Sequence, residues 1–192
     1  MNLSPDKQTV CGLVLAGGQS KRMGTDKALL MLNGQTVIER VVQILASVSD
    51  ELLLVVNEPS RYQFLNLPTV TDQVPNSGPL MALYSGLFQA SASWCLATAC
   101  DAPLLQPQLL KHLLEYRGSA DAVLPFINNK IQPFPGLYSK TCTSILESLL
   151  SKGHSAARDI ASACNVATVN EERIRTLDPD LKSFQDLDTP SD

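Results

Sequence analysis

The sequence lacks the patterns that mark several common classes of protein. It has five cysteines, an odd number, and no two of them show the CxxC spacing of zinc sites and thioredoxin-type sites. It has no apolar run long enough to cross a bilayer, and its opening residues, MNLSPDKQTV, lack the apolar core of a signal peptide. We therefore expect a cytoplasmic protein with reduced, mostly buried thiols.

The sequence also lacks an excess of positive charge. Lys and Arg number 15 against 19 Asp and Glu, which gives a formal net charge of -4. This balance argues against nucleic acid or an anionic membrane as a partner, because both attract basic surfaces. Hydrophobic residues make up 44% of the 192 residues and charged residues 18%, so we expect a globular chain with one domain over residues 1–192.

Two kinds of apolar pattern alternate along the first two-thirds of the chain. Near-continuous apolar runs predict strands covered on both faces, and runs with helical spacing predict the helices between them. The expected strands are residues 10–16, 51–57 and 94–100, and the expected helices are residues 36–48, 78–90 and 107–118. This alternation is typical of right-handed crossover units, so we expect an α/β fold with a doubly wound, mostly parallel sheet. The remainder predicts strands at 121–126 and 135–140 and helices at 143–151 and about 156–163.

The stretch LVLAGGQSKRMGTDKALL, residues 13–30, joins the first predicted strand to a basic loop. Gly17 and Gly18 let the backbone approach an anion closely, and three cations follow, among them Arg22 and Lys27. The P-loop pattern GxxxxGK[ST] and the dinucleotide fingerprint GxGxxG are both absent. We interpret the loop as a polyphosphate site of another kind, and the alternative is a tight turn with solvated lysines.

Polar residues also follow two other predicted strands. Ligands of open α/β sheets bind beyond the carboxyl ends of the strands, where Asn57 and Asp101 are expected beside the glycine loop. Asp101, in CDAP, could hold Mg²⁺, which takes one or two carboxylates together with phosphate oxygens; the alternative is a turn-initiating aspartate. The nucleophile elbow GxSxG is absent, so covalent catalysis has no candidate. Nucleotidyl transfer can instead rely on positioning and charge neutralisation.

The stretch LAGGQSKRMGTDK closely resembles the nucleotidyltransferase signature LAGG-x-S-x-R-M-G-x-D-K. With the ALL that follows it, it looks most like the MobA family, the molybdenum cofactor guanylyltransferases. The resemblance continues, in order and over nearly the whole chain, through VVN at 55–57, TDQVPNSGPLMAL at 71–83, CDAP at 100–103, QPFPGLY at 132–138 and FQDLDTP at 184–190.

The resemblance implies a Rossmann-like nucleotidyltransferase fold and a Mg²⁺-dependent enzyme. Such an enzyme transfers GMP from GTP to the terminal phosphate of the molybdenum-molybdopterin cofactor, forming molybdopterin guanine dinucleotide and pyrophosphate. Transient contacts with the proteins that supply and receive the cofactor are expected as well. Carried over by position, the implied GTP-binding residues are Leu15, Ala16, Gly17, Gly18, Lys27, Asn57, Asp72 and Asp101; the catalytic residues are Arg22, Lys27 and Asp101; and the metal ligands are Asp101 with Asp188 or Asp186.

The chemistry of guanine agrees with the place of Asp72 in this set. Guanine presents its N1–H and its exocyclic amino group side by side, and one carboxylate can accept both, whereas the adenine edge would oppose it. Asp72 is therefore a candidate for choosing GTP over ATP. The alternative is that Asp72 caps the loop at Gly78.

Two departures from the family's pattern bear on the second substrate and the metal. Asp186 and Asp188 stand in the tail where the family usually has asparagines, which affects a metal or pterin-phosphate contact. Gln132 stands where histidine often precedes proline, which affects a pterin-side contact.

Three rival functions fit the same sequence pattern. They are a cytidylyltransferase of the same cofactor pathway, a sugar-phosphate nucleotidyltransferase, and a catalytically silent nucleotide-binding regulator. Cytidylyltransferase relatives tend to read AAG where this chain reads AGG, which favours GTP. The retained Arg22, Lys27 and Asp101 argue against a silent regulator.

Overall fold

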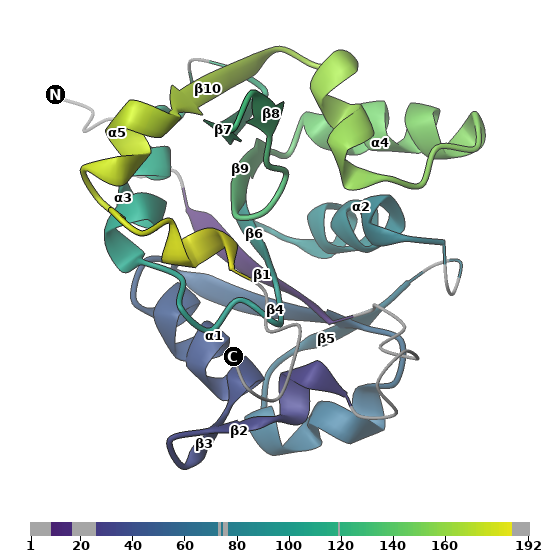
Figure 1. Ribbon diagram of the computed structural model, residues 1–192. Helices are drawn as coiled ribbons and strands as arrows, with labels where there is room; N and C mark the ends of the chain where they lie inside the picture. Colours follow the sequence, from purple (N-terminus) through teal and green to yellow (C-terminus); the bar gives the residue numbers. More distant parts are fainter. Residues whose placement is uncertain (1–8, 17–25, 73, 75–76, 119, 186–192) are drawn as a thin grey trace, which may run out of the picture.

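The computed structural model describes residues 9–16, 26–72, 74, 77–118 and 120–185. Within these ranges a main sheet is flanked by helices on both faces (Figure 1). Its strands are β1 (Val10–Ala16), β4 (Glu51–Val56), β5 (Thr69–Thr71), β6 (Trp94–Ala99), β7 (Ala122–Ile127), β8 (Lys130–Ile131), β9 (Gly136–Ser139) and β10 (Val166–Asn170). The helices are α1 (Val37–Ala46), α2 (Pro79–Gln89), α3 (Pro107–Glu115), α4 (Cys142–Ser151) and α5 (Glu171–Arg175). Short 3₁₀ helices are η1 (Lys27–Leu29), η2 (Pro59–Leu65), η3 (Ala157–Ser162) and η4 (Lys182–Phe184), and β2 (Met31–Leu32) pairs with β3 (Gln35–Thr36) in a separate hairpin.

The sheet order is β10-β7-β9-β6-β1-β4-β5, with β8 paired to β7. β1 runs parallel to both of its neighbours, β4 and β6, and the pairs β4–β5 and β7–β10 are parallel too. β9 runs antiparallel to β6 and β7. The predicted α/β fold with a doubly wound, mostly parallel sheet is therefore confirmed.

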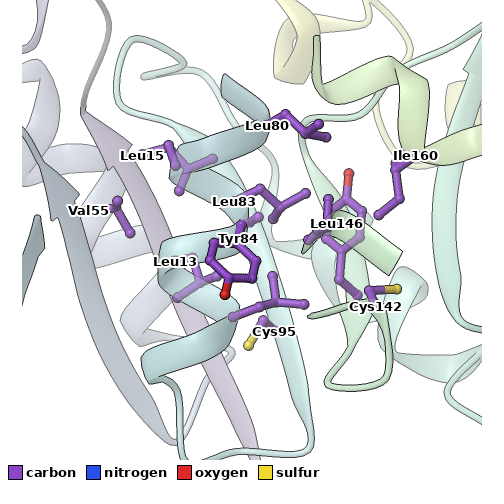
Figure 2. Close-up of a cluster of buried hydrophobic side chains, with 14 of the residues drawn as sticks. Leu13, Leu15, Val55, Leu80, Leu83, Tyr84, Cys95, Cys142, Leu146 and Ile160 are labelled. Carbon is purple, nitrogen blue, oxygen red and sulfur yellow. The ribbon is translucent and has the colours of Figure 1, made fainter. Parts of the chain in front are cut away.

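The core has two parts, one on each face of the sheet. Alternate residues of β1 point to opposite faces, so Leu13 joins a cluster with α2 and α4, while Val14 joins a cluster with α1 and α3. Figure 2 shows the first cluster, in which Leu13, Leu15 and Val55 on the strands lie beside Leu80, Leu83 and Tyr84 of α2. Because β1 is covered on both faces, its sequence is apolar throughout rather than alternating.

Local signals in the sequence account for the helix starts. Thr36 and Glu39 form the predicted capping box at α1: Glu39 N–H donates to Thr36 Oγ1 (3.3 Å), and Thr36 N–H donates to Glu39 Oε2 (2.7 Å). A hydrogen bond from the Thr36 hydroxyl to Glu39 Oε2 (2.6 Å), and then the one from Thr36 N–H, lower the pKa of the Glu39 carboxyl. Pro79 and Pro107 occupy the first turns of α2 and α3, where a missing N–H leaves no hydrogen bond unmade.

Two glycines, one within α2 and one at its N-cap, lie where a Cβ would be crowded. A Cβ at Gly86 would lie 2.9 Å from Leu13 Cδ1. Because glycine has no Cβ, the helix can pack close to the sheet at this position. Gly78, at the N-cap, has φ of 86°, and a Cβ there would lie 2.8 Å from Ser155 O. That same carbonyl accepts a hydrogen bond from Leu80 N–H (3.1 Å), which fixes the start of α2 against the chain that follows α4.

Other features of the fold bear on the remaining sequence predictions. The helix expected near residues 156–163 is present as the short 3₁₀ helix η3. The five cysteines form no disulfide, and Cys11, Cys95 and Cys142 are buried, as expected. In the part of the chain that the structure describes, every helix is too short or too polar to span a membrane.

Lys140, directly after β9, caps the C-terminal end of α2. Its ammonium group donates hydrogen bonds to the carbonyl oxygens of Leu87, Phe88 and Ala90, the Phe88 contact measuring 3.0 Å. The positive charge also opposes the negative end of the helix dipole. These contacts tie β9 to α2 across one face of the sheet.

We expect Lys140→Met to lower the free energy of unfolding by about 1–3 kcal/mol, because hydrogen bonds to a charged donor are among the stronger ones and the carbonyls lose their partner. Lys111→Met is the matched control, since Lys111 is an exposed lysine on α3. Urea unfolding of the three proteins measures the difference. Equal stability of the two variants would contradict a structural role for Lys140.

Candidate active site

The carboxyl ends of β6, β1, β4 and β5 lie side by side at one edge of the sheet. The register pairs Leu15 with Ala99, Ala16 with Val56, and Val56 with Thr71. Asn57 and Asp72 directly follow β4 and β5, and Asp101 lies two residues beyond β6. Neighbouring strands lie about 4.8 Å apart, so the row from β6 to β5 spans about 14 Å. This confirms that the strand ends meet at one edge, as the sequence predicted.

The described residues include only part of the predicted site. Leu15 and Ala16 are the last two residues of β1, and Leu15 O accepts a hydrogen bond from Cys100 N–H (3.1 Å), one residue before Asp101. Lys27 opens η1. The other predicted residues, Gly17, Gly18, Arg22, Asp186 and Asp188, lie outside the described ranges.

Asp72 is a buried carboxyl at this edge, with only 8% of its surface exposed. Its Oδ1 has no hydrogen-bond partner among the residues that the structure describes, and the same holds for the Oγ of Ser85 on α2. Burial raises the pKa of the Asp72 carboxyl, and the nearby Ser85 hydroxyl lowers it by less. Buried polar atoms of this kind are rare without a partner, so the pair is suited to a ligand that donates hydrogen bonds.

The structure gives no support to the alternative role of Asp72 as a cap for the loop at Gly78. The N-cap of α2 is Gly78 itself, which has no side chain, and Asp72 Oδ1 accepts no hydrogen bond from the described part of this loop. Sequence reasoning missed Ser85, because a serine in an apolar helix gives no signal that its hydroxyl faces the end of a strand.

Asp101 is half-buried in the turn that follows β6. The next residues, Ala102 and Leu105, are buried and joined by a hydrogen bond from Leu105 N–H to Ala102 O (3.3 Å), which holds the turn against the core. The described ranges contain no cluster of three or more His, Cys, Asp or Glu side chains that could hold a metal by itself. A single carboxylate such as Asp101 does fit Mg²⁺, which takes one or two carboxylates and completes its coordination with the phosphate oxygens of a substrate and with water.

Hydrogen bonds to Asp26, the residue before Lys27, fix the turn that carries Lys27. Asp26 is the N-cap of η1, and its Oδ1 accepts a hydrogen bond from Ala28 N–H (3.1 Å). Its Oδ2 accepts one from the hydroxyl of Tyr62 (2.7 Å), which lies in η2 after β4. Nothing local in the sequence indicates this contact of Tyr62, which spans 36 positions of the chain.

A cavity of about 190 Å³ lies beside the end of β6. Its walls come from three parts of the chain: the end of β6 with the turn after it, the stretch 132–135, and η4. Gln132, which departs from the family pattern, is in its wall. Two contacts hold the other walls: Tyr138 hydroxyl donates to Pro133 O (2.6 Å), and Gln106 N–H donates to Ser183 Oγ (2.9 Å).

The chain is similar to a defined group of proteins. The family model of the MobA-like NTP transferase domain matches residues 12–168. A molybdenum cofactor guanylyltransferase from Desulfosudis oleivorans is 34% identical over 94% of this chain and 90% of its own length. A probable molybdenum cofactor guanylyltransferase from Carboxydothermus hydrogenoformans is also 34% identical, over 96% of this chain and 93% of its own.

A solved structure shows that the fold is shared. The crystal structure of molybdopterin-guanine dinucleotide biosynthesis protein A from Archaeoglobus fulgidus superposes with a TM-score of 0.81 at 24% sequence identity, over 94% of this chain and 93% of the other. The sheet order, the row of strand ends and the family match agree with one another. The chain belongs to the family of MobA-like NTP transferases.

Proposed function

We propose that this chain is a Mg²⁺-dependent molybdenum cofactor guanylyltransferase that works as a single nucleotidyltransferase domain. It transfers GMP from GTP to the terminal phosphate of the molybdenum-molybdopterin cofactor and releases pyrophosphate. The names of its relatives support this reaction. The observation that carries the choice of base is Asp72, a buried carboxyl whose Oδ1 has no hydrogen-bond partner among the described residues.

Guanine matches Asp72 better than the other bases do. The guanine N1–H and amino group are two adjacent donors, and the ionised carboxylate can accept both. Adenine places an acceptor nitrogen next to its amino group, so one carboxylate oxygen would face a lone pair. A buried acceptor that one base satisfies and another leaves unpaired discriminates strongly between them.

The order of the strand ends then sets the direction of the nucleotide. With guanine at the end of β5, the ribose passes Asn57 at the end of β4, and the phosphates extend toward β1 and β6. Lys27 and Arg22 neutralise charge that builds up on the triphosphate, while Asp101 is the residue that would hold the metal. When bound, Mg²⁺ would neutralise the phosphate oxygens during transfer. The attacking phosphate is already anionic near neutral pH, so no side chain is needed as a base.

The second substrate enters from the other end of the row. The cavity beside β6 lies on the side of Asp101 that is farther from Asp72 in the strand order, with Gln132 in its wall. An acceptor bound there presents its phosphate at the end of the nucleotide opposite the base. This arrangement lets both substrates meet at the α-phosphate without crossing.

Pyrophosphate release with each of the four nucleoside triphosphates, in the presence of loaded cofactor, tests the proposal. We expect release with GTP and little with ATP, CTP or UTP. A preference for CTP would indicate a cytidylyltransferase. Turnover with a sugar phosphate in place of the cofactor would indicate the sugar-phosphate class, and GTP binding without turnover would indicate a silent regulator.

Asp72→Asn is expected to weaken GTP binding and to narrow the preference for GTP over ATP, because an amide cannot accept both guanine donors. It should also stabilise the nucleotide-free protein at neutral pH. Burial raises the pKa of the Asp72 carboxyl above its value in the unfolded chain, so the ionised group costs the folded state free energy above both pKa values. This gain should vanish as the pH falls below the ordinary pKa of aspartate.

Binding titrations with GTP and ATP, combined with urea unfolding across pH, measure both effects of Asp72→Asn. Asp180→Asn is the matched control, since Asp180 is exposed. If the Asp72 variant still discriminates between GTP and ATP as sharply as the parent, base selection lies elsewhere in the site.

Asp101→Ala is expected to lower metal-dependent turnover by about 100-fold or more, because the transferring phosphate loses its anchored counter-charge. Replacement of Asp186 or Asp188 should cost less, since Asp101 is fixed by a central strand. Of these two tail acids, Asp188 is the preferred second contact. Activity titrated with Mg²⁺ in the three variants makes the comparison. Full activity of Asp101→Ala at ordinary Mg²⁺, together with loss in a tail variant, would assign the principal ligand to the tail.

A further inference from the structure

We infer that Tyr62 and Asp26 form a positioning pair that sets the place of Lys27 in the active site. The inference rests on the proposed role of Lys27 at the triphosphate. Neither member of the pair needs to touch the nucleotide, because both act on the backbone that carries Lys27. The geometry of the turn, the burial of Tyr62 and the charges around Asp26 each support this role.

The side chain and the main chain of Asp26 both accept hydrogen bonds from the residues that follow Lys27. Asp26 Oδ1 accepts a hydrogen bond from the N–H of Ala28 (3.1 Å), and Asp26 O accepts one from the N–H of Leu29 (3.0 Å). The carbonyl of Lys27 itself accepts a hydrogen bond from Leu30 N–H (3.2 Å). The backbone of Lys27 is therefore fixed on both sides, provided that the Asp26 carboxylate keeps its orientation.

Tyr62 supplies that orientation. Its hydroxyl donates a hydrogen bond of 2.7 Å to Asp26 Oδ2, so the two carboxylate oxygens have separate partners. Its ring is 4% exposed and belongs to the same core cluster as Val14, Val56 and Ala28. Burial, and then the hydrogen bond to Asp26, raise the pKa of the Tyr62 hydroxyl well above its usual value, so it stays protonated and remains a donor.

Arg61 offsets the charge of Asp26. A carboxylate next to a triphosphate site would repel the substrate, and Arg61 Nη1 lies 3.6 Å from Asp26 Oδ2. The same guanidinium contacts Glu58, with Nε 2.6 Å from Oε2. Because the Arg61 side chain is half exposed, this ion pair is weak, and the hydrogen bond from Tyr62 is the more specific contact.

The pair also joins two parts of the site that are distant in the sequence. η2, which carries Tyr62, starts two residues after Asn57 at the end of β4. Asp26 and Lys27 belong to the segment that follows β1. The hydrogen bond therefore couples the turn that bears the phosphate-binding cation to the strand end expected to contact the nucleotide. A small shift of Lys27 in such a site can cost a large part of the rate.

A double-mutant cycle on pyrophosphate release, with GTP and loaded cofactor, tests the inference. Lys27→Ala is expected to lower kcat/KM roughly 100- to 1000-fold. Tyr62→Phe keeps the buried ring and is expected to lower kcat/KM roughly 10- to 100-fold, with a melting temperature close to that of the parent. If Tyr62 acts through Lys27, adding Tyr62→Phe to Lys27→Ala should cause no further loss.

Two further variants keep the test independent of folding and of tyrosine burial. Tyr84→Phe is the matched control, since Tyr84 is similarly buried, at 7% exposed, but lies on α2 in the other core cluster; its kcat/KM should stay at the parental value. Asp26→Asn weakens the same hydrogen bond by changing its acceptor. The loss of kcat/KM in this variant should not add to the loss caused by Tyr62→Phe.

Three outcomes would overturn the inference. Parental activity of Tyr62→Phe would show that the hydroxyl positions nothing. A loss that multiplies that of Lys27→Ala would show that Tyr62 acts on the fold or on another residue, and the proposed function would stand. Parental activity of Lys27→Ala would remove both this inference and the proposed role of Lys27.

Discussion

The parallel pairing of β1 with β4 and β6 is the constraint on which the rest of the site depends. Because the three strands run the same way and are in register, each one ends at the same edge. The pairing in turn requires helices on both faces, which explains why the strands are apolar throughout. The polar residues of the site follow the strands rather than interrupt them, so the core and the site do not compete for the same positions.

Two aspartates at this edge of the sheet differ in the hydrogen bonds that their carboxyl groups make within the protein. Both oxygens of Asp26 have a hydrogen-bond partner within the protein, and an arginine lies nearby. Asp72 is more deeply enclosed, and its Oδ1 has no partner among the described residues. The first arrangement stabilises the local backbone, whereas the second reserves hydrogen-bonding capacity for a ligand. The base selectivity proposed for Asp72 therefore comes at the expense of stability.

The sequence predicted the centre of the fold well because its signals there are local. Strands β1, β4 and β6 are short, continuous apolar runs, and the Thr36–Glu39 capping box marks the start of α1. The positions of Asn57 and Asp101 follow from the strand ends alone. Asp72 is different: β5 has only three residues, lies at the edge of the sheet and has two exposed side chains, so the resemblance to the family identified Asp72 when periodicity did not. Tyr62 and Ser85, which lie near Asp26 and Asp72, come from distant parts of the chain, and no local pattern indicates that proximity.

The contact between Gly78 and Ser155 has a consequence for how the chain can vary in length. The Ser155 carbonyl both fills the space beside Gly78 and accepts the hydrogen bond of Leu80, so the link between α4 and η3 is fixed to the entrance of α2. An insertion in this link would displace α2, the helix that covers Asp72, although the link and Asp72 are far apart in the sequence. The β7–β8 turn, at Asn128 and Asn129, is attached to α5 instead, because Asn128 N–H donates a hydrogen bond to Glu171 Oε2 (2.9 Å). An insertion at that turn would therefore disturb α5, whereas one in the link would disturb the helix beside Asp72.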